Sequence, residues 1–180
     1  MNRRHPFELA APVNDADHTI GPANAGVTVV EYGDLECPNC KQAAPAVKLI
    51  LRRFAGRIRF VYRHFPLEEV HPHAMQAAEA AESAGAQDRF WPMHDLLFEN
   101  QAHLKLHDLR RYAEQLQLDI ARYTFEMDDH VYLQRVREHL QTGLESGARS
   151  TPTFFVDGKL KDVSFGLPAL FDAVEAALSK

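Results

Sequence analysis

Cysteine is scarce in this chain of 180 residues, which contains only Cys37 and Cys40. Because the two lie three positions apart, no further thiol remains for a structural cross-link, and a disulfide-stapled secreted scaffold is excluded. In a reducing compartment a lone Cys-x-x-Cys pair is either catalytic or metal-binding. The sequence therefore poses a choice between redox chemistry and a metal site.

Long apolar runs and a large excess of one charge are also lacking. No stretch reaches the about 18 apolar residues that indicate a membrane-spanning helix, so we expect no membrane insertion. The net charge is only -5, with acids and bases interspersed, which gives no sign of binding to nucleic acid or to an anionic membrane. Arg3 and Arg4 are not followed by the apolar segment of a secretory signal, so we expect a cytoplasmic location.

The length of the chain suits one packed domain. With 180 residues, 46% of them hydrophobic, it can bury a single core but is short for two. Residues 1–26 are rich in Pro, Asn, Asp, Ala and Gly and predict an irregular N-terminal arm. The remaining residues, 27–180, contain no internal repeat and are expected to fold as one domain.

A strand, a helix and a second strand are predicted around the cysteines. Residues 27–32 (VTVVEY) form a β-branched run between two glycines, which predicts a mostly buried strand. Apolar side chains then recur at helical spacing as far as Phe54, so the cysteine pair opens a helix with Pro38 in its first turn. Residues 58–65 predict a second strand and complete a β-α-β unit whose strands should be parallel.

Helical periodicity runs through residues 71–147 without a strand candidate. Residues 154–160, with Asp157-Gly158 at their centre, predict a tight hairpin. A last amphipathic helix follows Pro168. The predicted fold class is therefore α/β, in the order β-α-β, helices, β-β-α, with an all-helical insertion between the second and third core strands.

The place of the cysteines at the start of a helix suits redox chemistry. A thiolate attacks a disulfide, and the unpaired N–H groups and the macrodipole at a helix N-terminus stabilise its charge. Cys37 is therefore the expected nucleophile. Cys40 lies one turn further on, where it can attack a mixed disulfide from within, and it is the expected resolving thiol.

A zinc site is the alternative that these residues leave open. His71 and His73 could complete a set of two cysteines and two histidines. Their His-x-His spacing is unusual for ligands on a helix, whereas a strand, a Cys-x-x-Cys pair and a helix in this order are typical of a redox motif. We therefore expect no metal, and we expect none of His64, His71, His73 and His94 to be catalytic.

Residues 29–42 (VVEYGDLECPNCKQ) resemble the active-site segment of DsbA-like members of the thioredoxin superfamily. The resemblance continues at 65–67 (FPL), 90–101 (FWPMHDLLFENQ) and 150–158 (STPTFFVDG), and it covers most of the chain after residue 14. It implies a thioredoxin fold with a helical insertion. It also implies a thiol-disulfide oxidoreductase whose working group is the disulfide of the two cysteines, without a dissociable cofactor.

The resemblance implies roles for five further residues. Pro152 matches the cis-proline that faces the cysteines in this family, and Thr151 and Pro152 should bind the substrate backbone. Glu31 matches a buried acid beneath the resolving cysteine, where it could take that cysteine's proton. Pro38 and Asn39 should also contact substrate, and they stand where the family often has a histidine next to the nucleophile. Without that histidine we expect a redox potential between those of thioredoxin and DsbA.

Three functions are compatible with these observations. The first is exchange of the Cys37-Cys40 dithiol or disulfide with protein or small-molecule thiols and disulfides. The second is a glutathione-linked transferase or isomerase, because related folds bind that thiol beside a cis-proline, although the presence of both cysteines argues against it. The third is a redox-sensing binding module that regulates a partner protein such as a membrane transporter.

Overall fold

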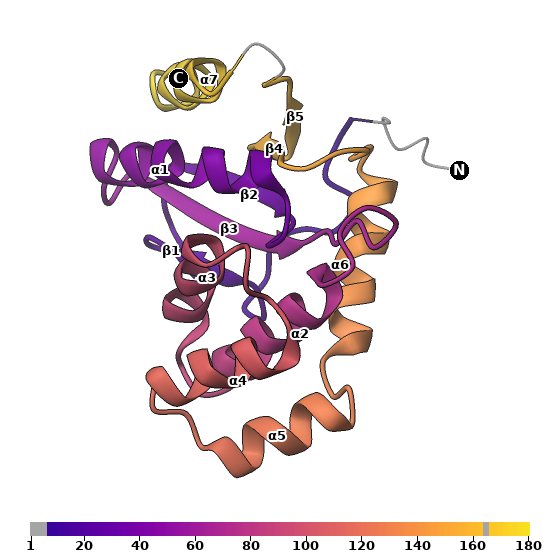
Figure 1. Cartoon of the computed structure of the whole chain (residues 1–180). Helices are drawn as coiled ribbons and strands as arrows, with labels where there is room; N and C mark the ends of the chain where they lie inside the picture. The colour runs from indigo at the N-terminus through magenta and orange to yellow at the C-terminus, as the bar shows by residue number, and fades with distance from the viewer. Residues whose placement is uncertain (1–6, 164–165) are drawn as a thin grey trace.

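A five-stranded mixed sheet forms the centre of the molecule (Figure 1). The computed structural model describes residues 7–163 and 166–180. The strands stand in the order β1-β3-β2-β4-β5; β2 and β3 are parallel, and every other neighbouring pair is antiparallel. Their bounds are His18–Ile20 for β1, Val27–Gly33 for β2, Ile58–His64 for β3, Thr153–Val156 for β4 and Lys159–Lys161 for β5.

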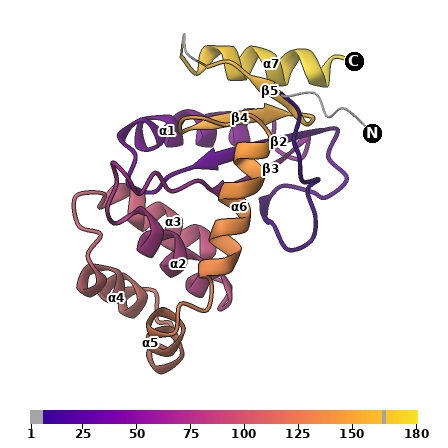
Figure 2. The ribbon, with the colours of Figure 1, turned by 90° about the vertical axis from the view of Figure 1, so that its right-hand side faces the viewer.

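The helices of the described ranges confirm the predicted order of elements. One connects β2 to β3, five follow one another between β3 and β4, and one ends the chain. Figures 1 and 2 show α4 and α5 at one end of the molecule and α7 at the opposite end. The bounds are Pro38–Arg53 for α1, Ala74–Gly85 for α2, Phe90–Glu99 for α3, Leu106–Gln115 for α4, Ile120–Asp128 for α5, Leu133–Glu145 for α6 and Pro168–Leu178 for α7. The all-helical insertion between the second and third core strands is therefore confirmed.

Both faces of the sheet are covered, and each has its own apolar cluster. Val27 and Val29 of β2 belong to the larger cluster, together with residues of α1, α3 and α7. The alternate residues Val30 and Tyr32 belong to a smaller cluster, against which Leu140 of α6 packs. Burial on both faces explains why β2 is a nearly continuous apolar run rather than an alternating one.

The hairpin between β4 and β5 turns at Asp157 and Gly158, as predicted. Both residues have positive φ, 48° and 76°, the combination that a two-residue turn matched to the twist of its strands requires. The Asp157 carboxylate also accepts a hydrogen bond from the backbone N–H of Thr28, at 2.9 Å. This bond ties the turn to β2.

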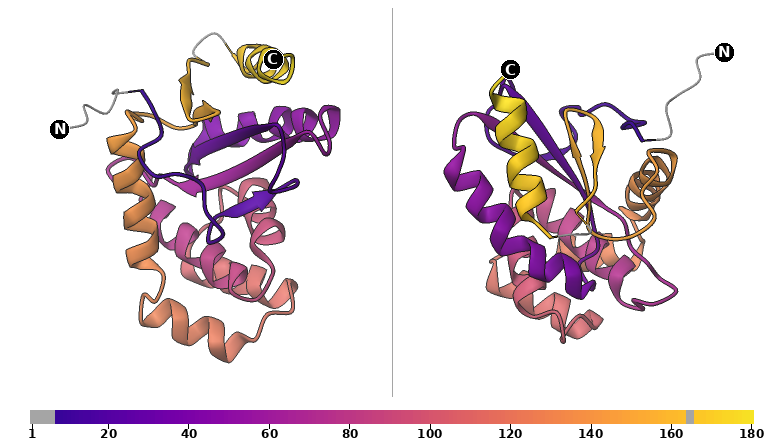
Figure 3. Two further views of the ribbon diagram at one scale, coloured as in Figure 1. Left: turned by 180° about the vertical axis from the view of Figure 1, so that it is seen from behind. Right: turned by 90° about the horizontal axis from the view of Figure 1, so that it is seen from above.

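The prediction of an irregular N-terminal arm is wrong for β1. This strand pairs antiparallel with β3, with Thr19 opposite Val61, and Figure 3 shows the arm following that edge of the sheet. His18 also stacks on Phe90, with ring centroids 3.5 Å apart. Three residues are too few to give a period-2 pattern, and the strand exists because of these distant partners. The division of the chain at residue 26 stays a prediction.

The helices are short for crossing a bilayer. The 16 residues of α1 fall below the about 20 that a membrane span needs. Among the described residues, no helix combines the length and the apolar character of such a span.

Candidate active site

The cysteine pair lies just after the end of β2, at the start of α1. Cys37 is the N-cap residue, with extended backbone (φ -74°, ψ 123°), and Pro38 is the first helical residue, where its missing N–H is not needed. Cys37 and Cys40 are buried free thiols, whereas Pro38 and Asn39 between them are exposed. The exposed dipeptide marks the side from which a partner can approach, and the prediction that the pair opens a helix is confirmed.

The peptide bond between Thr151 and Pro152 is cis, as the resemblance implies. Cys37 Sγ lies 3.5 Å from the Thr151 carbonyl oxygen, to which its thiol form can donate a hydrogen bond, across 114 positions of sequence. The loop before β4 is therefore in direct contact with the expected nucleophile. The role of Thr151 and Pro152 in binding substrate stays a prediction.

The pKa of the Cys37 thiol is lowered to about 5. The largest cause is the hydrogen bond from the Cys40 thiol; burial opposes the shift, while Thr151 and the backbone N–H groups of Cys40 and Asn39 support it. At neutral pH this cysteine is a thiolate, which is the reactive form in disulfide exchange. The geometry therefore favours the predicted assignment of Cys37 as nucleophile.

Cys40, by contrast, is held as a protonated thiol. It is fully buried, and burial, the bond to Cys37 and the charge of Glu31 all raise the pKa of its thiol. One hydrogen bond from the backbone N–H of Asp34, at 3.4 Å from Sγ, partly offsets this. Cys40 therefore needs a base to remove its proton before it can attack.

Glu31 lies on β2 among buried apolar residues and is itself only 4% exposed. Burial, and then the negative charge of Cys37, raise the pKa of its carboxyl from 4.5 to about 8. The charge of Glu31 is one of the causes that raise the pKa of the Cys40 thiol, so the two groups belong to one electrostatic environment. The predicted burial of Glu31 is confirmed, and its role as a base stays a prediction.

Two carboxylates hold the loop that leads into Cys37. Asp34 accepts a hydrogen bond from His71 Nδ1 at 2.7 Å, and Glu36 accepts one from His73 Nδ1 at 2.9 Å. These are the two histidines of the alternative zinc site. Their bonds to carboxylates account for both side chains without a metal ligand role.

Gln101 is a site residue that the sequence reasoning missed. Its amide Nε2 donates to the carbonyl oxygens of Leu35 and Cys37, at 3.0 and 2.8 Å. It thereby fastens the active-site loop to the segment after α3. The signal was available, because Gln101 ends the motif at 90–101 that carries part of the resemblance.

A hollow of about 830 Å³ opens beside the cysteines. Asn39 and Gln42 of α1, the cis pair Thr151-Pro152 and Arg149 are among the residues that line it. Asn39, Thr151 and Pro152 thus share one surface, as their predicted common role requires. Pro38 is exposed next to it but does not line the hollow.

A second group of titratable side chains surrounds Glu82 of α2. His64, Glu82 and His139 bring three potential metal-ligand atoms within 4.8 Å of one another. The Glu82 carboxylate, however, already lies 2.9 Å from His18 Nε2, 3.0 Å from His64 Nε2 and 2.7 Å from Arg135 Nε. The guanidinium of Arg135 repels a cation, and we therefore assign this group a structural role.

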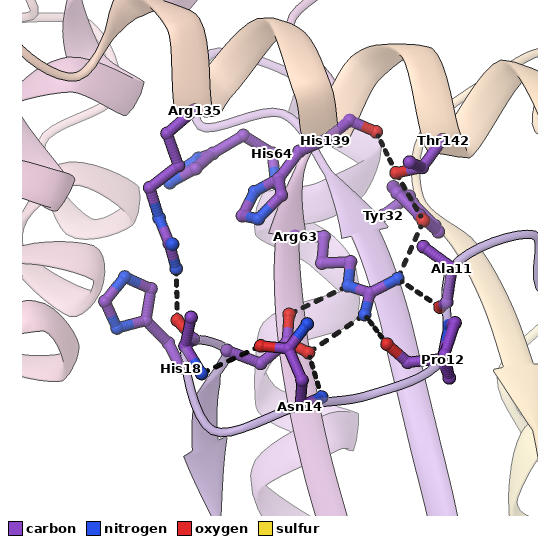
Figure 4. A network of polar contacts seen from close by, with 12 residues as sticks. Ala11, Pro12, Asn14, His18, Tyr32, Arg63, His64, Arg135, His139 and Thr142 are labelled. Carbon is purple, nitrogen blue, oxygen red and sulfur yellow. Dashed lines mark hydrogen bonds and ion pairs between the residues drawn. The ribbon is translucent and has the colours of Figure 1, made fainter.

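Next to His64 on β3, Arg63 forms a second group of polar contacts (Figure 4). Its guanidinium donates to both carboxylate oxygens of Asp17, at 2.8 and 2.9 Å. It also donates to the carbonyl oxygens of Ala11 and Pro12 and to the Tyr32 hydroxyl, at 2.8, 3.1 and 3.1 Å. The side chain thus fastens the N-terminal arm to β3.

Comparisons with known proteins agree with this fold. Residues 13–175 match the family model described as Thioredoxin. The oxidised BdbD of Bacillus subtilis superposes with a TM-score of 0.85 at 21% identity, covering 97% of this chain and 99% of that one. A thioredoxin-like oxidoreductase from Silicibacter pomeroyi DSS-3 gives a TM-score of 0.81 at 24% identity, covering 93% and 95%. The thioredoxin fold with a helical insertion, in the form expected of DsbA-like proteins, is confirmed.

A curated relative with higher sequence identity is named as an antiporter rather than as a thioredoxin-like protein. The chain is 48% identical over 174 residues to a protein named Na(+)/H(+) antiporter NhaA 1, from Salinispora arenicola (strain CNS-205). The match covers 96% of this chain but 26% of that protein. The chain spans about a quarter of the length of the curated relatives it matches.

Proposed function

Because the chain belongs to the thioredoxin family, we propose that it is a thiol-disulfide oxidoreductase that acts on protein or small-molecule thiols and disulfides. One observation carries the proposal. Cys37, with its pKa lowered to about 5, lies at the start of α1 opposite the Thr151 carbonyl, and Cys40 lies one turn behind it. A stabilised thiolate next to a second thiol is what two-step disulfide exchange needs.

The reduction of a substrate disulfide proceeds in two steps. The Cys37 thiolate attacks one sulfur of the substrate, the substrate S–S bond breaks, and the first substrate thiolate leaves. Once Cys37 is in the mixed disulfide, its negative charge no longer helps to hold the proton on Glu31, and the carboxyl releases that proton. The ionised Glu31 then takes the proton of Cys40, whose thiolate attacks Cys37 Sγ. The mixed disulfide breaks, a Cys37-Cys40 disulfide forms, and the second substrate thiolate leaves with the electron pair. Oxidation of a substrate dithiol is the same sequence in reverse.

The remaining expected properties fit this reaction and stay predictions. The exposed Pro38-Asn39 dipeptide and the edge at Thr151-Pro152 would bind an extended substrate segment. The chemistry uses only the two cysteines, so we expect no dissociable cofactor. The cytoplasmic location stays a prediction as well.

Trapping of the mixed disulfide tests the proposed function. Replacement Cys40→Ser removes the resolving thiol, so adducts with substrate or with glutathione should accumulate on Cys37 and be visible by mass spectrometry. The matched control is Cys37→Ser, which should trap little. Adducts found mainly on Cys40 in folded protein would reverse the assignment, and no adducts in either variant would refute the function.

A second candidate function comes from the name of the relative. The chain is 48% identical to about a quarter of a protein named as a Na(+)/H(+) antiporter, which favours a redox-sensing module that regulates such a transporter. Antiport measured with the two cysteines oxidised and then reduced would distinguish the candidates. A change in transport between the oxidised and the reduced protein, seen with no thiol or disulfide substrate present and absent in Cys37→Ser, would support regulation rather than catalysis.

A further inference from the structure

A small cavity lies next to Glu31, away from the substrate hollow. Its volume is about 70 Å³, and Glu31 of β2, Lys48 of α1, and His94 and Asp95 of α3 take part in its lining. The rest of its wall is apolar and aromatic, Trp91 among it. Space of about 10–15 Å³ on this measure holds one water, so the cavity is large enough for water, and it has the polar partners that a bound water needs.

His94 contributes an unsatisfied acceptor to this region. Its Nδ1 lies 3.2 Å from Asp95 Oδ1, and because a carboxylate only accepts, this nitrogen carries the hydrogen. Burial lowers the pKa of the imidazole, so the ring is neutral at neutral pH and Nε2 bears a lone pair. Nε2 is buried and has no hydrogen-bond partner among the described residues. A buried acceptor of this kind calls for a proton donor or a water.

The line of polar groups continues from His94 to solvent. Asp95 also accepts a hydrogen bond from Lys48 Nζ at 2.8 Å, and the side chains of Lys48 and Asp95 are 50% and 38% exposed. Glu31, at the inner end of this line of polar groups, is buried, so its carboxyl does not reach bulk solvent directly. The cavity and His94 thus join the buried carboxyl to the surface.

We infer that His94 conducts the proton that Glu31 takes from Cys40, through water in the cavity, to solvent at Asp95. His94 Nε2 receives a proton as Nδ1–H gives one up toward Asp95 or water, so the ring stays neutral, and it returns to its starting tautomer by exchange with the surrounding water. Apart from the S–H bond of Cys40, only N–H and O–H bonds change. The inference rests on the proposed function, and His94 is a positioning residue for the proton because it acts through Glu31.

Several charged or titratable groups adjoin this path and will shape its pH dependence. Cys37, the N-cap of α1, acts on the charge of Glu31, and Glu31 in turn acts on Cys40 of α1 and Tyr62 of β3. Asp95 of α3, His64 of β3 and Lys48 of α1 act on the charge of His94. A pH profile is therefore compared between variants and the unchanged protein rather than read in isolation.

Single-turnover kinetics with a chromogenic aromatic disulfide test the inference in the full chain. One coloured thiolate is released when Cys37 attacks and a second when Cys40 resolves, so the two steps are seen separately. In His94→Ala we expect the first release unchanged and the second slowed roughly tenfold, below the about 100-fold or more that a direct acid–base group supplies. His139→Asn, which changes a half-buried histidine outside the cavity, is the matched control and should leave both releases unchanged.

Chemical rescue separates proton conduction from packing. Free imidazole should restore the second release in His94→Ala, whereas pyrazole, a ring of the same shape but far weaker basicity, should not. A second variant, His94→Gln, keeps polar atoms but cannot carry a proton and should also be slow. Equal second releases in all variants, or equal rescue by pyrazole, would overturn the inference.

A readout that needs no substrate distinguishes failure of the relay from failure of the function. The exchange of the Glu31 carboxyl proton for deuterium can be followed by its infrared band. We expect His94→Ala to slow this exchange at least tenfold, and unchanged exchange would overturn the route. Absence of the first coloured release in the unchanged protein would instead refute the proposed function.

Discussion

Arg63 and Glu82, at 2% and 3% exposure, are buried as deeply as Glu31 at 4%, but their surroundings differ. We call Asp17, His18, Arg63, His64, Glu82 and Arg135 the paired network, because each of its charges lies within 3.0 Å of an opposite charge or a polar partner within the group. Glu31 faces the thiols of the cysteine site instead. Lys48, the cation nearest its cavity, is bound to Asp95.

This difference sets the protonation states of the two regions. Within the paired network, burial raises the pKa of Glu82, but hydrogen bonds from His18 and His64 outweigh it and hold the pKa well below its usual value. At the cysteine site, burial and the charge of Cys37 act in the same direction and raise the pKa of Glu31. Paired burial thus gives fixed charges that hold the fold, and unpaired burial gives groups ready to exchange protons.

Breaking one pair in the network should have the largest effect on stability. Arg63→Met leaves the Asp17 carboxylate buried without its cation, which should lower the free energy of unfolding by about 3–5 kcal/mol. The double variant with Asp17→Leu removes the stranded charge as well and should recover most of the loss. Denaturant titration of the single and double variants measures both values, and a double variant no more stable than Arg63→Met would contradict the pairing.

At the cysteine site, by contrast, a substitution should increase the free energy of unfolding. Because the folded pKa of Glu31 is about 8 and the ordinary value of the carboxyl is 4.5, the folded state binds more protons between these values, and stability falls as pH rises through them. Glu31→Gln should therefore be more stable than the unchanged reduced protein by roughly 3 kcal/mol at pH 7 and by little near pH 4.5. A variant that is less stable at pH 7 would show that Glu31 is paired after all.

Acid should act in the reverse sense on His139, which stacks on His64 beside the paired network. Burial, and then the nearby charge of His64, lower the pKa of His139 from 6.5 to about 3, so the unfolded chain takes up its proton first and stability falls as pH drops below 6.5. His139 contributes a loss of about 2 kcal/mol by pH 5. His139→Asn keeps an acceptor for the backbone N–H of His64 and should lack this loss. Equal pH slopes in thermal melts would refute it.

The redox potential is the smallest expected effect. Stabilisation of the Cys37 thiolate favours the dithiol form, so equilibration with glutathione should give a potential between about -270 mV, as in thioredoxin, and about -120 mV, as in DsbA. Asn39→His places a further donor next to that thiolate and should raise the potential by about 20 mV, or about 1 kcal/mol. A potential more negative than that of thioredoxin would contradict this expectation.

The features predicted from the sequence are those with a local pattern. The β-α-β unit, the helical insertion and the Asp157-Gly158 turn each repeat over enough residues, or use special enough ones, to be recognised. The cysteine site follows from one spacing and the resemblance. β1 could not be predicted, since its three residues are a strand only because β3 and Phe90 lie beside them.

The part His94 plays in the site was also beyond the sequence. It lies 63 positions after Glu31, and both line one cavity because α3 packs near α1 and the sheet. In the sequence it is one of several histidines that could titrate near neutrality, and no pattern distinguishes it from the others. Its tautomer and its unpartnered Nε2 are properties of the folded chain.

Alkylation of the reduced protein as a function of pH tests most directly whether the hydrogen bonds at the start of α1 hold Cys37 as the reactive thiolate against the effect of burial. The rate of reaction with iodoacetamide follows the thiolate fraction, and mass spectrometry assigns the modified residue. We predict a midpoint at about pH 5 with modification confined to Cys37, in agreement with its lowered pKa. A midpoint near the ordinary cysteine value of about 8.5, or modification mainly at Cys40, would contradict the account.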